Sequence, residues 1–335
     1  MCIRDSNIIE RKHHIYHQLG KRKEAGKELA KLADAFPDNL VYKHQLARYF
    51  EQIGSRKNAK VVYQEILRLN PEDAKASIAL ASYNNGNQSN DLGYLQTLSE
   101  LFKKDDVLLD VKVAKLYPYI EAVGTEKDPT KRQAILDLGK LLTETHSSAA
   151  KAFSLYGDML YQVDDLPNAL AQYKLALKED DTVYAVWQNA MEIMHLLGKY
   201  DELLDFSEEA IDYFPNQGTS YYYSGLASKH QNNMGEALNS YQLALMISGK
   251  DPYLAGEIYA AMSAVYSQQK KHDKAIEMAK DGLNINPKSA TLLEQYGDAL
   301  FQNGEEEAAI NQWKKALEFN KKSTTLERKI ANRSL

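Results

Sequence analysis

Small and aromatic residues return at a fixed period of 34 residues along most of this chain, and this period limits the folds that the chain can form. Gly, Ala, an aromatic residue and Ala follow one another at the same internal spacing in three copies: Gly157, Ala169, Tyr173 and Ala176; Gly225, Ala237, Tyr241 and Ala244; Gly297, Ala309, Trp313 and Ala316. A period of this length is typical of a stacked array, in which each unit packs only on its neighbours. The sequence therefore predicts an array of repeated units and not the core of a globular enzyme.

Four further copies carry parts of the same template, so seven copies are recognisable in all. They are marked by Gly20, Ala25 and Pro37; by Gly54, Ala59 and Pro71; by Trp187, Gly198, Tyr200, Ala210 and Pro215; and by Tyr259, Tyr266, Ala275 and Pro287.

The segment from Glu72 to Thr145 breaks the template but keeps an apolar pattern of helical spacing. Its apolar positions are Leu92, Leu95, Leu98, Ile135, Leu138 and Leu142. We interpret this segment as two degenerate helix pairs and expect Pro118 to kink or end one helix, because proline lacks the backbone donor. The stretch from Asn84 to Asn90 is predicted to be the least structured. We expect a hinge or a second binding surface in this segment.

Close contact between helices explains the template. The glycines at 157, 225 and 297 would lie where the first helix of a unit meets the second, so a larger side chain would push the two helices apart. The alanines allow the same close approach, and the aromatic residue between them fills the remaining space. Each buried aromatic or leucine side chain contributes about 1.5–3 kcal/mol, and the units must stack to bury this surface.

These residues resemble the tetratricopeptide repeat, and the resemblance covers seven of nine expected units. It implies an all-α fold: a right-handed α-solenoid of stacked antiparallel helix pairs with a C-terminal capping helix. Some positions depart from the family pattern, since Ala279 and Gly282 replace an aromatic residue and an alanine. We divide the chain into a leader at 1–6, two repeat units at 7–71, two degenerate helix pairs at 72–149, five repeat units at 150–322 and a capping helix at 323–335.

Residues 1–6 do not continue the helical pattern and resemble an appended leader, so we expect the original N-terminus to be missing. As written, the chain has no signal peptide and no apolar run long enough to span a membrane, which indicates a soluble chain. The final unit around Trp313 resembles the closing repeat of bacterial envelope-associated tetratricopeptide proteins. That resemblance implies the periplasm or cell envelope if a signal has been lost, and the cytoplasm is expected otherwise.

Composition limits the class of partner. A net charge of −5 over 335 residues is small and argues against nucleic acid or an anionic membrane as the main partner. The single Cys2 forms no internal disulfide and no thiolate metal cluster. Many of the 22 tyrosines occupy core positions of the template, and the others are free to face a groove. We expect one or more proteins or peptides as partners, and self-association stays open.

No motif of an enzyme is present in the sequence. His13 and His17 have the spacing of two metal ligands on a helix, but no third ligand accompanies them at a fixed spacing. No Gly-x-Ser-x-Gly nucleophile elbow and no Gly-Lys-Ser/Thr phosphate loop occurs. We therefore predict no catalytic residue, no metal and no cofactor.

In tetratricopeptide arrays the first helix of each pair lines a concave groove, and the resemblance implies which residues face it. The implied partner-binding residues are His44, Arg48, Ser154, Asp158, Tyr161, Gln188, Glu192, His195, Tyr222, Lys229 and Asp298. The Lys and Asn of the carboxylate clamp, by which chaperone-binding relatives hold C-terminal peptides, are absent from these positions. We expect a polar groove with an acidic C-terminal half, suited to a basic or neutral extended peptide or to a partner helix. A merely solvated face is the alternative at each single position.

Three classes of function follow from these expectations. The leading one is a non-enzymatic scaffold that binds a segment or helix of a partner protein. The alternatives are a peptide-sensing regulatory module and an accessory repeat region of a larger protein whose catalytic domain lies outside this fragment.

Overall fold

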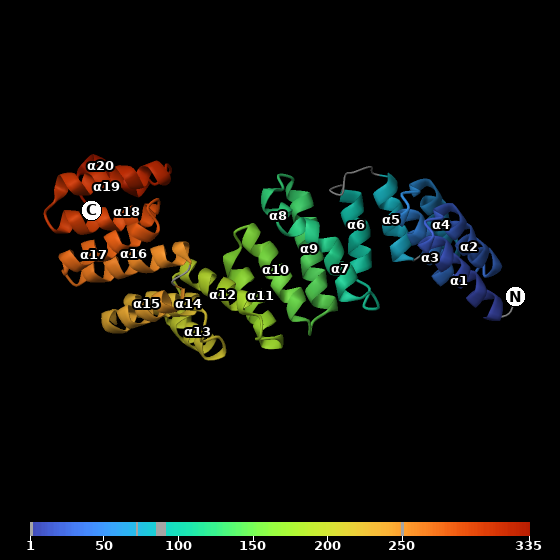
Figure 1. Cartoon of the computed structure of the whole chain (residues 1–335), viewed down its shortest axis with the longest axis horizontal. Helices are drawn as coiled ribbons and strands as arrows, with labels where there is room; N and C mark the ends of the chain where they lie inside the picture. Colours follow the sequence, from blue (N-terminus) through green and yellow to red (C-terminus); the bar gives the residue numbers. More distant parts are fainter. Residues whose placement is uncertain (1–2, 72, 85–91, 249–250) are drawn as a thin grey trace. The chain divides into compact units, whose positions relative to one another are not determined.

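The computed structural model describes residues 3–71, 73–84, 92–248 and 251–335, and these residues form helices and short connections with no strand among them (Figure 1). The chain divides into two compact units, Met1–Asp165 and Leu166–Leu335, called unit 1 and unit 2 below. In unit 2, and from α1 (Ile3–Gln18) to α6 (Leu92–Phe102) in unit 1, helices that follow one another in the sequence pack on each other, and in the rest of unit 1 α6 packs mainly on α9 (Pro129–Thr145). The predicted all-α fold of the helical repeat solenoid class is confirmed.

The described part of unit 1 contains helices α1 to α10. Their bounds are α1 Ile3–Gln18, α2 Arg22–Ala35, α3 Leu40–Gln52, α4 Arg56–Leu69, α5 Ala74–Asn84, α6 Leu92–Phe102, α7 Leu109–Ile120, α8 Ala122–Thr125, α9 Pro129–Thr145 and α10 Ala150–Gln162.

The described part of unit 2 contains helices α11 to α20. Their bounds are α11 Leu166–Glu179, α12 Tyr184–Leu196, α13 Tyr200–Tyr213, α14 Gly218–His230, α15 Met234–Ser248, α16 Pro252–Gln268, α17 His272–Ile285, α18 Ala290–Gln302, α19 Glu306–Phe319 and α20 Thr324–Asn332.

One turn geometry recurs where the first helix of a pair ends. A residue with positive φ follows at Asp164 (63°), Gly198 (68°), Asn232 (65°), Lys270 (58°) and Gly304 (86°). The spacings are 34, 34, 38 and 34 residues, so the period of the sequence is also the period of the backbone. The longer spacing spans helix α16, which has 17 residues where α14 and α18 have 13. One extra helical turn therefore accounts for the four added residues.

The predicted role of the small residues is confirmed in the helix pairs of unit 2. A Cβ atom placed on Gly225 would lie 2.5 Å from the ring of Tyr241, and one on Gly297 would lie 2.5 Å from the ring of Trp313. In the pair α16–α17 the corresponding residue is Ser263, which is fully buried and donates a hydrogen bond to the carbonyl of Ala275 at 2.8 Å. The aromatic ring or the serine hydroxyl thus fixes how closely the two helices approach.

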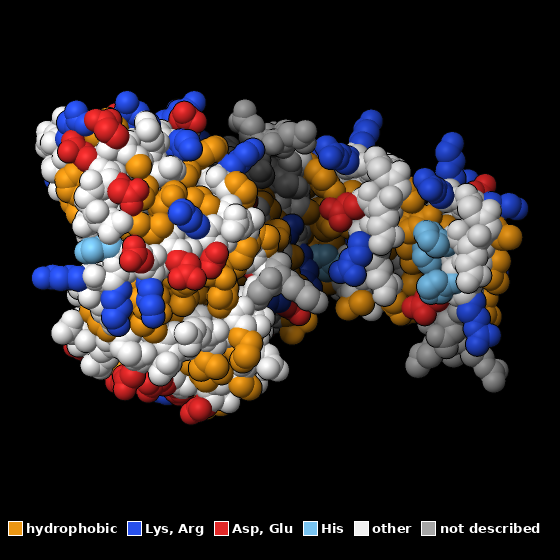
Figure 2. All heavy atoms as spheres, turned by 60° about the vertical axis from the view of Figure 1, so that its left-hand side comes forward, with side chains coloured by type: hydrophobic (Ala, Val, Ile, Leu, Met, Phe, Trp, Pro, Cys, Tyr) orange, Lys and Arg blue, Asp and Glu red, His pale blue; other side chains and the backbone are white. Residues whose placement is uncertain are grey.

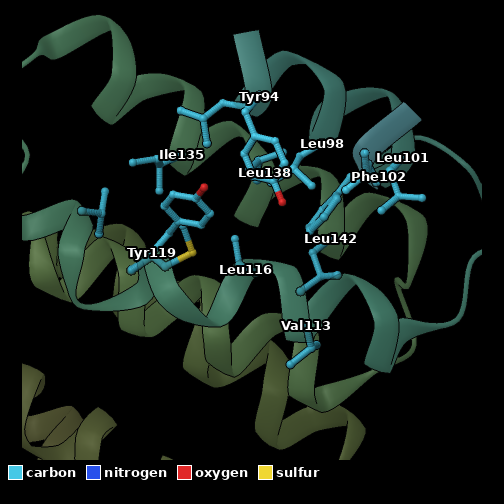
Figure 3. Packing of buried hydrophobic residues seen from close by; sticks show 14 of the residues in the cluster. Tyr94, Leu98, Leu101, Phe102, Val113, Leu116, Tyr119, Ile135, Leu138 and Leu142 are labelled. Atoms are coloured by element: carbon cyan, nitrogen blue, oxygen red, sulfur yellow. The ribbon is translucent and has the colours of Figure 1, made fainter. Parts of the chain in front are cut away.

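The segment that breaks the template forms an apolar core mostly from helices α6, α7 and α9, to which α5, α8 and α10 also contribute (Figure 3). Of the six predicted apolar positions, Leu95, Leu98, Ile135, Leu138 and Leu142 are buried in this core, and Leu92 is half-buried. Pro118 lies within α7, which ends two residues later at Ile120, and the short helix α8 follows. The stretch that we predicted to be least structured lies outside the described residues, apart from Asn84 at the end of α5.

The N-terminal helix differs from expectation. We expected residues 1–6 to lie outside the helical pattern, but α1 begins at Ile3, and only residues 1–2 lie outside the described part. The backbone of residues 3–6 is therefore continuous with the first helix. The origin of this segment stays a prediction.

None of the helices in the described ranges combines the length and the apolar character that a membrane-spanning segment requires.

Candidate partner-binding surface

In unit 2 the first helices of successive pairs contact one another in sequence order, α12 with α14, α14 with α16 and α16 with α18. Polar side chains of these first helices that keep part of their surface exposed form the candidate surface. We call it the first-helix face and define it by Gln188, Glu192 and His195 on α12, Tyr222 and Lys229 on α14, and Glu257 on α16. Gln188 is exposed and the other five are half-buried. Half-buried polar side chains on adjacent helices are suited to contact a partner without unfolding the core.

Three groups meet where α14 and α16 run side by side. Burial and the nearby carboxylate of Glu257 both raise the pKa of the Tyr222 hydroxyl, and Tyr253 at the start of α16 acts in the same direction. Burial also raises the pKa of Glu257, against a hydrogen bond from Thr291 of α18 that lowers it. Tyr253 itself is 72% exposed. This end of the first-helix face is thus an aromatic and acidic patch.

The start of α16 is set by its cap. The carboxylate of Asp251 accepts hydrogen bonds from the backbone N–H groups of Tyr253 and Leu254 at 2.9 and 3.2 Å, and Pro252 occupies the first turn. Asp is favoured before a helix because its carboxylate accepts hydrogen bonds from the free N–H groups of the first turn. Pro is favoured in the first turn because it has no N–H group that would stay unpaired. The cap therefore holds Tyr253 beside Glu257.

The last turns of α12 and α14 carry the basic groups of the face. Burial lowers the pKa of Lys229 and of His195. The pKa of His230 is lowered by burial first and then by the charges of Lys229 and His195, so the three groups lie close together. Tyr200 stacks on His230 with ring centroids 3.4 Å apart and lies within 3.4 Å of Nδ1 of His195.

Two half-buried charges on this face lack an ionic partner. Among the described residues, Lys229 makes no hydrogen bond and no ion pair, and the carboxylate of Glu257 has only the hydrogen bond from Thr291. The acidic group acting on this cluster is Glu192, which raises the pKa of His195. Charges that are partly removed from water and left unpaired lower the stability of the folded protein. Lys229 and Glu257 are therefore retained at a cost in folding stability.

The C-terminal end of the array differs from the predicted acidic groove. Lys329 of α20 donates to Asp298 Oδ2 at 2.7 Å and to Glu294 Oε1 at 2.8 Å, and the indole N–H of Trp313 donates to Asp298 Oδ1 at 2.8 Å. Burial raises the pKa of Asp298, and the contacts with Lys329 and Trp313 oppose that shift. Both carboxylates are therefore paired within the protein with one lysine, which offsets part of the expected negative charge at this end, and an acidic groove here stays a prediction.

The predicted residues of unit 1 lie on α3 and α10. His44 Nε2 is 2.9 Å from Asp73 Oδ2, and Ser154 donates to the carbonyl of Lys151 at 3.2 Å. Asp158 and Tyr161 are half-buried on α10. Exposed Arg48 lines a hollow of about 270 Å³, whose other lining residues are Glu10, His13, His14, Leu29, Gln45, Tyr49 and Gln52.

The histidines of α1 pack against an aromatic ring. The ring centroids of His13 and His17 lie 5.0 and 5.8 Å from that of Tyr49, and a ring nitrogen of His13 hydrogen-bonds the carbonyl of Ala25 at 3.0 Å. Within the part of the chain that the structure describes, no three His, Cys, Asp or Glu residues are grouped so as to hold a metal ion.

The structure brings His195, Tyr222 and Lys229 together on one surface, and it adds two residues that were not predicted from the sequence. Glu257 lies on the first helix of the unit that contains Tyr259, and the resemblance already placed first helices along the groove, so this signal was available. Lys329 gave no such signal, because its contacts with Glu294 and Asp298 join residues 35 and 31 positions apart.

Comparison with known proteins identifies the repeat. The model of the tetratricopeptide repeat family matches residues 41–73 and 256–289. The second match begins one residue before Glu257, in the unit with the longer first helix. The two matches and the recurring backbone geometry agree: the chain contains tetratricopeptide repeats, a repeat that serves as a protein-interaction scaffold.

Similar proteins cover only parts of this chain. It is 33% identical over 91 residues to the photosystem I assembly protein Ycf3 of Acaryochloris marina, which is 27% of this chain and 54% of that protein. It is 28% identical over 97 residues to the small glutamine-rich tetratricopeptide repeat-containing protein 2 of Mycosarcoma maydis, which is 29% of this chain and 26% of that protein. The chain thus spans less than two thirds of the length of either relative.

Among solved structures, PilF of Pseudomonas aeruginosa is similar with a TM-score of 0.49 and 15% identity, over 67% of this chain and 97% of that one.

Proposed function

We propose that this chain is a non-enzymatic scaffold that binds a peptide segment or a helix of a partner protein on the first-helix face of unit 2. The observation that carries the proposal is the set of half-buried tyrosine, histidine and charged side chains on α12, α14 and α16, two of which have no ionic partner within the described protein. Rigid aromatic side chains beside hydrogen-bonding groups favour binding of a polypeptide, because they lose little conformational freedom.

The distribution of charge supports a protein partner. Figure 2 shows acidic, basic and hydrophobic side chains interspersed on the visible face of unit 2, without a continuous basic surface. Binding to nucleic acid depends on many Lys and Arg contacts to phosphate groups. The name of one curated relative, an assembly protein for photosystem I, also describes a protein that acts on other proteins.

The test is a crosslinking pull-down with the full chain as bait in lysate of the source organism. A variant with Glu192→Ala and Tyr222→Ala is compared with a control variant that carries Lys178→Ala and Glu208→Ala, two exposed positions on the second helices α11 and α13. We expect a defined protein to be retained by the parent and the control, to be lost with the face variant and to crosslink to α12 or α14. Equal retention by all three proteins would contradict the proposal.

A further inference from the structure

We propose that Lys229 and Glu257 form a two-point recognition site for an extended segment of a partner protein that carries one acidic and one basic side chain about four residues apart. This inference rests on the proposed function and specifies the chemistry of its ligand. The acidic side chain of the segment contacts Lys229, and the basic one contacts Glu257.

Lys229 and Glu257 lack the partners that usually compensate a half-buried charge. A half-buried ammonium group and a half-buried carboxylate each lose part of their hydration, and a protein normally compensates this loss with an ion pair or several hydrogen bonds. Among the described residues, Lys229 has neither, and Glu257 has one hydrogen bond from Thr291. A ligand that carried the two opposite charges would form ion pairs with groups that have already lost part of their hydration on folding. Binding would then require no further desolvation of these groups.

The C-terminal end of the same unit contains carboxylates on a first helix that are paired with a lysine of another segment. On α18, the carboxylates of Glu294 and Asp298 are paired with Lys329 of α20, whose side chain is only 10% exposed. Glu257 lies on α16, the preceding first helix, and no cation of the described chain reaches it. The pairing of Lys329 with the carboxylates of α18 is therefore an example, within this protein, of a lysine from another segment bound by acidic side chains of a first helix.

The side chains around each of the two charges favour a ligand group of opposite charge. Glu257 is neighboured by the tyrosines Tyr222 of α14 and Tyr253 of α16, and by Thr291 of α18. Aromatic faces beside a carboxylate favour a Lys or Arg side chain, through cation–π attraction as well as charge. Around Lys229 lie His195 of α12 and His230 of α14. Their lowered pKa values keep both imidazoles neutral near pH 7, and the N–H group of a neutral imidazole can donate a hydrogen bond to an acidic side chain. Glu192 of α12 is the acidic group that acts on His195.

The spacing follows from helix geometry. Tyr222, which neighbours Glu257, precedes Lys229 by seven residues on α14, about 10 Å along the axis. Glu257 lies on the adjacent helix, whose axis is displaced by about 9 Å in typical helix packing. The two charges are then about 14 Å apart, a distance that an extended chain spans in about four residues.

The test uses short dye-labelled peptides of Ser and Gly with one Lys and one Glu separated by about two to six residues, in both orders. Binding to the full chain is measured by fluorescence anisotropy at low ionic strength, where such contacts are least screened. We expect one order, at a spacing near four residues, to bind about tenfold more tightly than the rest. The double variant Lys229→Glu with Glu257→Lys should then prefer the opposite order at the same spacing.

Matched controls carry the same charge changes elsewhere in unit 2. The control variant Lys178→Glu with Glu208→Lys changes exposed positions and should keep the preference of the parent. The proposal is overturned if order and spacing have no effect, if the double variant keeps the parental preference, or if no peptide binds at concentrations up to about 1 mM. A negative peptide result together with a positive pull-down would overturn this two-point site and leave the scaffold function standing, whereas a negative pull-down would overturn the scaffold function, so the two failures are distinguishable.

Thermal unfolding gives a second readout that needs no ligand. If Lys229 serves recognition, Lys229→Met should leave the melting temperature unchanged or raise it, because it removes an unpaired charge. Lys329→Met, which breaks an existing ion pair, should lower it. An equal decrease for both variants would show that Lys229 has a structural role and would overturn the proposal.

Discussion

Lys329 on the last helix, α20, contacts both carboxylate oxygens of Asp298 on α18, at 2.8 and 2.7 Å. Asp298 also accepts a hydrogen bond from the indole of Trp313, which fills the space beside Gly297. One lysine of α20 thus connects to the aromatic residue that spaces the preceding helix pair. The contact between Lys329 and Asp298 is therefore coupled to the packing of Trp313 against Gly297 in the helix pair α18–α19.

Replacing Lys329 with Met should destabilise the C-terminal end of unit 2 by about 2–3 kcal/mol, because Asp298 and Glu294 would keep their negative charges without a cation. The measurement is the urea midpoint of the full chain, followed by circular dichroism. Lys322→Met is the control, since this lysine is exposed and should change the midpoint little. Equal midpoints for the two variants would show that the ion pair contributes nothing.

Replacing Gly225 with Leu should reduce stability by about 1–3 kcal/mol or more, as expected for overpacking. Even a Cβ atom at this position would lie 2.5 Å from the Tyr241 ring, which is fully buried and has no room to move. The control is Gly235→Ala on α15, where an added Cβ atom would have no neighbouring atom within 4 Å. Because alanine favours the helix more than glycine does, this variant should be more stable by up to about 1 kcal/mol. Thermal unfolding that is unchanged in the leucine variant would contradict the assigned helix contact.

The contacts that could be predicted from the sequence are those that repeat. Gly225 against Tyr241 and Gly297 against Trp313 follow from one template, because the same residue types meet at the same separation in each copy. The pairing of Lys329 with Asp298 occurs once and joins a groove position to a helix outside the template, so no periodic signal marks it. The division between Asp165 and Leu166 was not predicted either. The template runs across it without a change.

The core of α6, α7 and α9 contains one buried charge with a clear structural role. Lys112 of α7 is fully buried and donates to the carbonyl of Phe102 and to Oγ1 of Thr145, both at 2.8 Å. These acceptors belong to the last residues of α6 and α9, where the helix dipoles favour a cation.

Lys112→Met should therefore destabilise this core by about 2–3 kcal/mol, because it leaves a buried carbonyl group without a donor. Hydrogen exchange of the backbone amides in α6 and α9 is the direct measurement, and their rates should rise. Exposed Lys115 lies on the same helix, and Lys115→Met should leave the rates as in the parent. Unchanged rates in the Lys112 variant would show that the lysine does not hold the two helix ends.

The pH dependence of stability should reveal the environment of Glu257. Burial raises its pKa in the folded protein above the ordinary value of 4.5, and the hydrogen bond from Thr291 only opposes that shift. Between 4.5 and the higher folded-state pKa, the folded protein binds more of this proton than the unfolded chain does. The stability that protonation provides is thus fully present below pH 4.5 and is lost as the pH rises through the folded-state pKa.

Glutamine does not ionise, so Glu257→Gln should lack this loss and should gain stability relative to the parent as the pH rises from 4.5 to about 7. The urea midpoints of both proteins across this range are the measurement. Glu208→Gln, at an exposed position of α13, should show no such trend. A difference between Glu257→Gln and the parent that stays constant or shrinks with rising pH would mean that the folded protein already compensates the charge of Glu257. The carboxylate would then be no free contact for a basic side chain of a partner.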